Sequence, residues 1–227
     1  MRVRLITCLT AVAVLAAALL SGCSGVPKVP GTGSTETPTK RLAPAEVLQY
    51  KGKRLDSVDD FRENSIKGPQ TVDIKAYRLK VLGEVSKPLT LTYDQAIDRT
   101  QYEKVVRLNC VEGWSVDILW EGVLISDLLE QAGYDRSAKV VIFRCKDGYS
   151  TSLPLDFVVG NKILLASKMN GVDLPRERGF PFQVVAEDKW GYKWAKWVTS
   201  IEVSNDASFE GFWEKRGYDN SGDLPKK

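Results

Sequence analysis

The stretch that decides the fold is Arg107-Leu108-Asn109-Cys110-Val111-Glu112-Gly113-Trp114-Ser115. The residues from Lys104 to Leu108 have the composition of a short strand, and Glu112-Gly113 is typical of a sharp turn. A cysteine at the end of such a strand is presented by rigid backbone and lies beside backbone N–H groups. Cys110 is therefore a candidate metal ligand, with half of a disulfide or an ordinary buried thiol as the alternatives.

Short strands are expected along most of the chain. Alternating or β-branched segments predict strands at residues 77–85, 105–110, 115–123, 139–145, 149–153, 162–167, 181–186 and 196–203. The segment 115–123 is expected to be extended with a turn. Asp147-Gly148 and Asn170-Gly171 are expected hairpin turns.

Three short helices are expected between these strands. Thr92 and Gln95 fit a capping box that opens the first helix. The second, residues 125–132, should end at Gly133, and the third covers residues 154–159. Because strands and helices do not alternate as in βαβ units, the pattern predicts an α+β domain with mixed β-sheets and short helices.

Residues 1–22 are expected to be a lipoprotein signal peptide. Met1–Arg4 is basic, Leu5–Leu20 is apolar, and Leu20-Ser21-Gly22-Cys23 resembles a bacterial lipobox. The resemblance implies cleavage before Cys23, lipidation of its sulfur, and attachment to the extracytoplasmic side of the cell membrane. The alternative is an ordinary secretory signal with a chance cysteine.

The remaining chain divides into a tether and a single domain. Residues 23–45 contain almost no large apolar side chain, so they are expected to form a flexible tether. Residues 46–227 have the length and apolar content of one domain. The signal segment holds 2 of the 32 basic residues, which leaves 30 basic against 29 acidic residues. This balance gives no argument for binding nucleic acid.

The chain contains no histidine. This excludes Ser-His-Asp catalysis, Cys-His proteases, the usual His-containing zinc sites and haem attachment through Cys-x-x-Cys-His. Dinucleotide-binding and phosphate-binding glycine motifs are also missing from the sequence. If the protein is an enzyme, a cofactor is therefore expected to carry the chemistry.

Several segments match one family in order along the chain. Residues 108–115 resemble the molybdenum-ligand segment of the sulfite oxidase-like molybdopterin oxidoreductases. Further resemblances lie at residues 120–125, 147–155, 164–175, 190–198 and 211–218. Any one of these segments is a weak signal, but their order over residues 61–218 is strong. The resemblance implies a sulfite oxidase-like molybdopterin-binding fold and a molybdenum–molybdopterin cofactor.

The resemblance also implies roles for individual residues. Cys110 would ligate molybdenum, which suits the softness of a thiolate. Cofactor phosphate would be held by residues of one Trp- and Lys-rich segment, namely Lys193, Trp194, Ala195 and Lys196. The early loop over the pterin would contain Arg62, Glu63 and Asn64. Without the family match, the same lysines could simply flank a buried strand and face water.

Two positions depart from the family pattern. Relatives often carry His or Asn before the Gly-x-Pro segment and Arg after it, whereas this chain has Arg178 and Gln183. One hypothesis is that the positive charge has moved, so that Arg178 contacts the cofactor. The arginine cluster of a sulfite pocket is not evident, so the reductase members of the family are the closer guide.

A disulfide with Cys145 is the alternative to metal ligation by Cys110. With Cys8 in the signal segment and Cys23 lipidated, Cys110 and Cys145 would be the only pair able to form a disulfide in an oxidising compartment. If Cys110 ligates a metal, Cys145 is expected to be a buried or cofactor-adjacent thiol.

These observations predict an exported, lipid-anchored molybdopterin oxidoreductase that transfers an oxygen atom to or from a small oxo compound. Electrons would pass through a separate partner, such as a membrane haem protein or a cytochrome. One alternative is a cofactor-free lipoprotein of the same fold that binds a ligand or protein. Another treats Trp190–Trp197 as a membrane-surface patch, because aromatic and basic residues suit that interface.

Overall fold

The structure is a computed structural model that describes residues 45–225. The predicted signal peptide, the lipidation site at Cys23 and almost all of the predicted tether lie outside the described residues. Among residues 45–225, no helix has the length and apolar character needed to cross a membrane.

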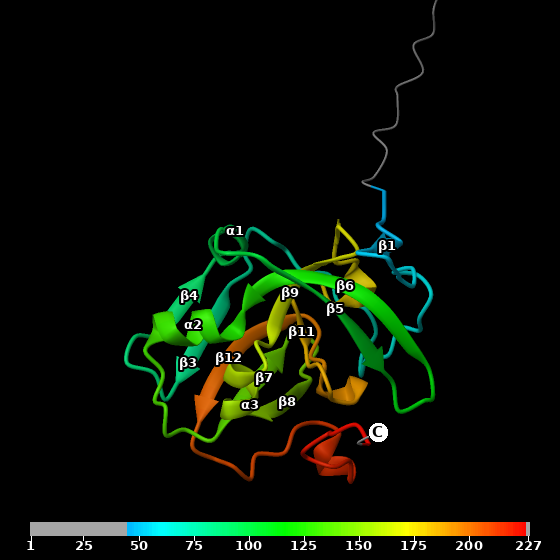
Figure 1. Ribbon diagram of the computed structural model, residues 1–227. Helices are drawn as coiled ribbons and strands as arrows, with labels where there is room; N and C mark the ends of the chain where they lie inside the picture. The colour runs from blue at the N-terminus through cyan, green and yellow to red at the C-terminus, as the bar shows by residue number, and fades with distance from the viewer. Residues whose placement is uncertain (1–44, 226–227) are drawn as a thin grey trace, which may run out of the picture. The chain divides into compact units, whose positions relative to one another are not determined.

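Two five-stranded sheets form the body of the described chain (Figure 1). The first sheet is antiparallel, and its strands are β5 (Tyr102–Asn109), β6 (Ser115–Leu124), β9 (Leu164–Met169), β10 (Val172–Asp173) and β11 (Gln183–Val185). The second sheet contains β3 (Leu79–Gly83), β4 (Leu89–Leu91), β7 (Val140–Cys145), β8 (Ser150–Pro154) and β12 (Val198–Ser204). Its β3–β12 pair is parallel and the others are antiparallel, so this sheet is mixed, as predicted.

The helices are short. The α-helices are α1 (Tyr93–Ile97), α2 (Ile125–Ala132) and α3 (Leu155–Gly160). The 3₁₀ turns are η1 (Arg176–Arg178), η2 (Gly191–Lys193) and η3 (Glu214–Arg216). A separate hairpin pairs β1 (Gln49–Tyr50) with β2 (Lys53–Arg54).

Local sequence signals account for several of these boundaries. The predicted capping box is confirmed, because Thr92 and Gln95 each accept the backbone N–H of the other. The predicted end of α2 is also confirmed, because Gly133 adopts the left-handed conformation at the C-cap. Asn170-Gly171 forms the turn between β9 and β10, as expected.

The turn expected within residues 115–123 is wrong, because β6 runs without interruption from Ser115 to Leu124. A bulge at Glu121/Gly122 shifts its register against β9 instead. A Cβ at Gly122 would lie only 2.2 Å from the Leu165 carbonyl oxygen. Glycine is therefore required here by the close approach of a neighbouring strand.

One hydrophobic core joins both sheets and the helices. Its fully buried members include Ile118 and Trp120 of β6, Phe143 of β7 and Ile201 of β12. The face of α2 that bears Leu128 and Leu129 is buried in the same core. This core fixes the ends of the strands, and the loops that leave those ends form the candidate site.

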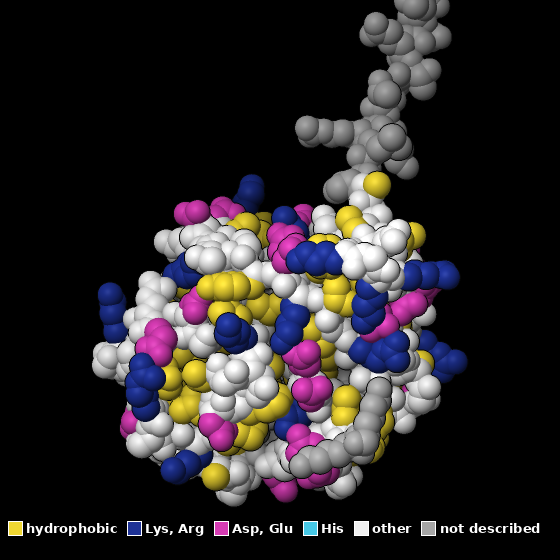
Figure 2. Space-filling model, viewed as in Figure 1, with side chains coloured by type: hydrophobic (Ala, Val, Ile, Leu, Met, Phe, Trp, Pro, Cys, Tyr) yellow, Lys and Arg dark blue, Asp and Glu magenta, His cyan; other side chains and the backbone are white. Residues whose placement is uncertain are grey.

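The face shown in Figure 2 carries basic and acidic side chains intermixed across the described surface. This mixture agrees with the near balance of basic and acidic residues in the sequence.

Candidate active site

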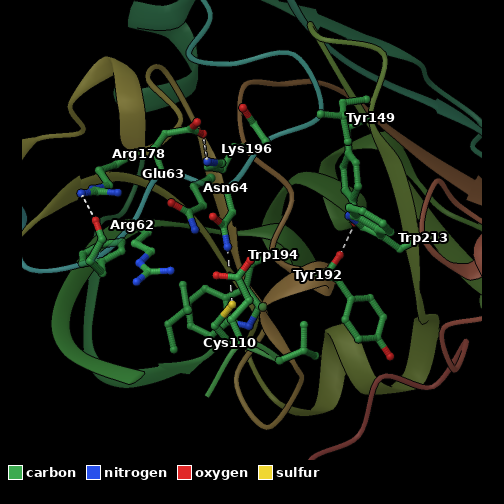
Figure 3. Close-up of a pocket in the computed structure, with 18 of the residues that line it drawn as sticks. Arg62, Glu63, Asn64, Cys110, Tyr149, Arg178, Tyr192, Trp194, Lys196 and Trp213 are labelled. Atoms are coloured by element: carbon green, nitrogen blue, oxygen red, sulfur yellow. Dashed lines mark hydrogen bonds and ion pairs between the residues drawn. The ribbon is translucent and has the colours of Figure 1, made fainter. Parts of the chain in front are cut away.

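A cavity of about 360 Å³ opens where five distant parts of the chain meet. Its walls come from the loop before β3, the end of β5 with the turn after it, the turn between β7 and β8, the segment from η1 to β12, and the C-terminal segment. The lining residues include Phe61, Arg62, Glu63, Asn64, Ser65, Ile66, Cys110, Glu112, Trp114, Asp147, Tyr149, Arg178, Gln183, Tyr192, Trp194, Lys196, Trp213 and Tyr218. Figure 3 shows ten of these with labels.

Cys110 lies directly after β5, as the sequence predicted. Its N–H donates to the Trp114 carbonyl at 2.9 Å, and its own carbonyl accepts the Gly113 N–H at 3.1 Å. Gly113 has a φ of 89°, a backbone conformation that favours glycine and that this tight turn requires. The turn holds the thiol in the cavity wall, where the residue is only 8% exposed.

Burial is the largest influence on the Cys110 thiol and raises its pKa, while N–H donors from Glu112, Asn64 and Val111 act in the opposite direction. The Asn64 amide donates to the sulfur at 3.6 Å. Several donors therefore converge on one buried sulfur, an arrangement that favours a thiolate once positive charge is supplied beside it.

The segment Phe61–Ile66, which we call the strap, contributes every one of its residues to the cavity wall. It brings Asn64 to Cys110 and Glu63 to Lys196, as Figure 3 shows. The predicted group Arg62, Glu63 and Asn64 therefore does lie at the candidate site. The strap also contains Ser65, whose buried hydroxyl has no hydrogen-bond partner among the described residues.

Lys196 is a largely buried cation in the cavity wall. Its ammonium donates to Glu63 at 2.6 Å, and the side chain is 16% exposed. Burial lowers the pKa of Lys196, and the hydrogen bond and charge of Glu63 oppose that effect. Within residues 45–225, the backbone N–H groups of Ala195 and Lys196 have no backbone acceptor. A cation beside unpaired N–H donors is suited to an anion such as phosphate.

Arg178 also lines the cavity, but its guanidinium forms hydrogen bonds to two backbone carbonyls. Nε donates to the Val58 carbonyl at 2.9 Å and Nη2 to the Phe61 carbonyl at 2.5 Å. Burial lowers the pKa of Arg178, with nearby Asp59 and Glu63 opposing, and the group remains a cation. Gln183 lines the same cavity. The predicted contact between Arg178 and the cofactor stays a prediction.

Three predicted site residues do not line the cavity. Lys193 is fully buried and donates to Glu214 at 2.7 Å and to the Asn220 carbonyl at 2.8 Å. Ala195 is fully buried, backbone included, and its predicted contact with the cofactor phosphate stays a prediction. Cys145 is buried in the core, and burial raises the pKa of its thiol well above the usual value.

The alternative disulfide is not formed. Cys110 and Cys145 are both buried free thiols. Among the described residues, no three His, Cys, Asp or Glu side chains form a cluster able to hold a metal ion.

The predicted residue Trp194 lines the cavity, but the other aromatic residues of the wall were not predicted from the sequence. Tyr149 donates its hydroxyl to the Tyr192 carbonyl, and the ring of Tyr192 contacts that of Tyr218 in an edge-on arrangement. Trp213 packs on Tyr218, with ring centroids 5.2 Å apart. These residues lie in segments that carry the family resemblance, and that signal could have identified them.

Comparison with known proteins identifies the family. A family model described as "Oxidoreductase molybdopterin binding domain" matches residues 66–213. The chain is 36% identical over 156 residues to the "Uncharacterized oxidoreductase YuiH" of Bacillus subtilis, a match that covers 68% of this chain and 78% of YuiH.

Two further relatives carry functional names. The chain is 36% identical to the "Putative protein-methionine-sulfoxide reductase subunit YedZ1" of Azospira oryzae, covering 65% of this chain and 56% of the relative. It is 26% identical to the "Protein-methionine-sulfoxide reductase catalytic subunit MsrP" of Xanthomonas campestris, covering 80% of this chain. The chain spans only 64% of that relative's length.

A solved structure supports the fold. The sulfane dehydrogenase SoxCD from Paracoccus pantotrophus superposes with a TM-score of 0.59 at 24% identity, covering 62% of this chain and 41% of the SoxCD chain. The predicted α+β, sulfite oxidase-like fold with mixed β-sheets and short helices is thus confirmed. The chain belongs to the oxidoreductases with a molybdopterin-binding domain, and molybdenum–molybdopterin is the cofactor of this family.

Proposed function

We propose that this protein is an exported, lipid-anchored reductase that removes the oxygen atom from a sulfoxide at a molybdenum centre ligated by Cys110. The observation that carries the proposal is the position of the buried Cys110 sulfur. It lies in the wall of the same cavity as Lys196. The names of two relatives, which refer to methionine sulfoxide, support this substrate class.

The residues of the cavity fit the cofactor. Cys110 offers one soft ligand, which suits a metal whose remaining sulfur ligands belong to the pterin. Lys196 would bind its phosphate through the side-chain ammonium and its own backbone N–H. The unpartnered hydroxyl of Ser65 provides a further polar group in the wall. When bound, the cofactor supplies two-electron oxygen-atom transfer.

The protein's own groups bind and orient the reacting molecules, and they exclude water from the cavity. Asn64 donates to the Cys110 sulfur and holds it toward the cavity. Trp213 and Tyr218 give the wall an apolar surface on which the carbon substituents of a sulfoxide could pack. Tyr218 is 38% exposed, so this surface continues to the outside of the molecule.

Reduction of a sulfoxide to its thioether and water consumes two electrons and two protons, and in this proposal the electrons come from another molecule. The chain has no histidine to ligate a haem, and its sequence lacks the haem-attachment motif. We propose a membrane haem protein or a cytochrome as the donor, with a lipid on Cys23 keeping the domain near the membrane. The names of both relatives describe them as subunits, which agrees with a partnered enzyme.

The test compares cysteine variants made in a host that synthesises molybdopterin. Reduction of methionine sulfoxide with a dye as electron donor should fall by at least roughly 100-fold in Cys110→Ala, because the metal loses its only protein ligand. Cys145→Ala is the matched control, since Cys145 is the other buried free thiol among the described residues and does not line the cavity. Equal activity in wild type and Cys110→Ala would exclude the proposed ligand.

A second candidate is a cofactor-free binding protein of the same fold. The changed positions Arg178 and Gln183 motivate it, since Arg178 already binds two carbonyls. Metal analysis separates the two candidates. Wild-type protein from a host that makes molybdopterin should contain molybdenum, and a ratio of metal to protein near zero would favour the binding protein.

A further inference from the structure

The strap has no regular structure of its own, since Phe61–Ile66 belongs to no helix or strand. Within residues 45–225, no backbone–backbone hydrogen bond has a strap residue as its donor or acceptor. Its position over the cavity therefore depends on side-chain contacts. Segments held in this way open at a lower free-energy cost than the core beneath them.

Arg178 fastens the beginning of the strap. Its guanidinium binds the carbonyls of Val58 and Phe61, and it lies 3.9 Å from the centroid of the Phe61 ring. Hydrogen bonds from an ionised donor are stronger than neutral ones, and the planar fork of arginine can hold two acceptors together. One side chain thus secures both the backbone and the ring of Phe61.

The remaining strap contacts reach the residues of the candidate active site. Glu63 binds Lys196, and Asn64 donates to the Cys110 sulfur. The Phe61 ring also packs against Trp114, which belongs to the turn that presents Cys110. A strap released at Phe61 would lose the alignment of Asn64 only three residues later.

We propose that Arg178 is a positioning residue, which fastens the strap over the cavity and thereby sets the Asn64 amide against the Cys110 sulfur. In this role Arg178 acts on the chain itself and needs no contact with the cofactor. The inference does not rest on the proposed reaction, so it is testable in protein without cofactor.

The experiment measures cysteine alkylation in full-length protein from a host that makes no molybdopterin. Iodoacetamide is the probe, and mass spectrometry of peptides follows Cys110 and Cys145 separately. Arg178→Ala should accelerate alkylation of Cys110 roughly tenfold and leave Cys145 unchanged, because the charged hydrogen bonds that keep the strap closed are lost.

Two further variants serve as controls for the alkylation experiment. Arg176→Ala is the matched control, because Arg176 is an exposed arginine of the same 3₁₀ turn and does not line the cavity. It should leave alkylation unchanged. Arg178→Lys keeps the charge but lacks the planar fork, so an intermediate rate is expected at Cys110. This variant keeps the test usable if Arg178→Ala does not fold.

Trypsin provides a second measurement, because the strap contains a cleavage site at Arg62. Cleavage after Arg62 should be faster in Arg178→Ala than in Arg176→Ala. Unchanged rates of alkylation and cleavage in both Arg178 variants would overturn the proposal. Equal acceleration at Cys110 and Cys145 would also overturn it, because it would assign Arg178 a general role in stability.

Discussion

The Asn64 side-chain nitrogen lies 3.6 Å from the Cys110 sulfur, although the two residues are 46 positions apart in the chain. The thiol of Cys110 follows the end of β5, and the amide of Asn64 belongs to the strap. Burial raises the pKa of Cys110, and N–H donors oppose that rise. The sulfur is therefore arranged so that an added metal cation completes the stabilisation of a thiolate.

Replacing Lys196 should reduce cofactor content. In Lys196→Ala the cavity loses its buried ammonium, and Glu63 loses the partner that lies 2.6 Å away. We expect the molybdenum-to-protein ratio, measured by elemental analysis, to fall by roughly tenfold, the scale seen when a supporting partner of a metal site is removed. Lys168→Ala is the control, because Lys168 pairs with Glu121 outside the cavity. Equal molybdenum in the two variants would argue against a phosphate contact at Lys196.

Lys193 should act mainly on stability. Lys193 and Glu214 form an ion pair in which both side chains are 0% exposed. Lys193→Met should lower the free energy of unfolding by roughly 3–5 kcal/mol, because it leaves a buried carboxylate without its cation. The double variant Lys193→Met/Glu214→Leu should recover most of this loss in urea unfolding.

Cofactor content of the same double variant tests the phosphate role predicted for Lys193. If Lys193 serves only the buried pair, the stable double variant should still bind molybdopterin. A folded double variant without cofactor would instead support a direct contact at Lys193.

Asp117 should make stability depend on pH in the acid range. Hydrogen bonding to Arg107 is the largest influence and lowers the pKa of Asp117 below 3.8, with Lys53 acting in the same direction. A depressed pKa in the folded state contributes stability above the unfolded value, and this contribution is lost as pH falls through the folded pKa. Both basic partners are more than half exposed, so the contribution should be about 1 kcal/mol.

Asp117→Asn provides the measurement for this effect. The variant should be less stable than wild type in urea unfolding near pH 6, and the difference should shrink near pH 3. A difference that stays constant between these pH values would mean that ionisation of Asp117 does not contribute.

Local patterns in the sequence predicted the position of Cys110 well. A β-rich run followed by Glu112-Gly113 requires only short-range information, and the structure places the thiol at the end of β5. The same holds for the capping box of α1 and the glycine that ends α2. These features depend on residues within one turn of each other.

Long-range contacts explain what the sequence did not predict. Gly122 resembles a turn residue, but the carbonyl of Leu165 on another strand is the reason for glycine there. Lys193 lies three residues before Lys196, yet η2 directs it to Glu214 in the C-terminal segment. Neither partner can be identified from the local pattern, because each lies more than twenty residues away.

The most direct test is X-ray absorption at the molybdenum edge, comparing wild type with Cys110→Ala after production in a host that makes molybdopterin. We expect wild type to contain molybdenum, and the variant either to lose the metal or to show one sulfur neighbour fewer. The same number of sulfur neighbours at full occupancy in both proteins would contradict ligation by Cys110.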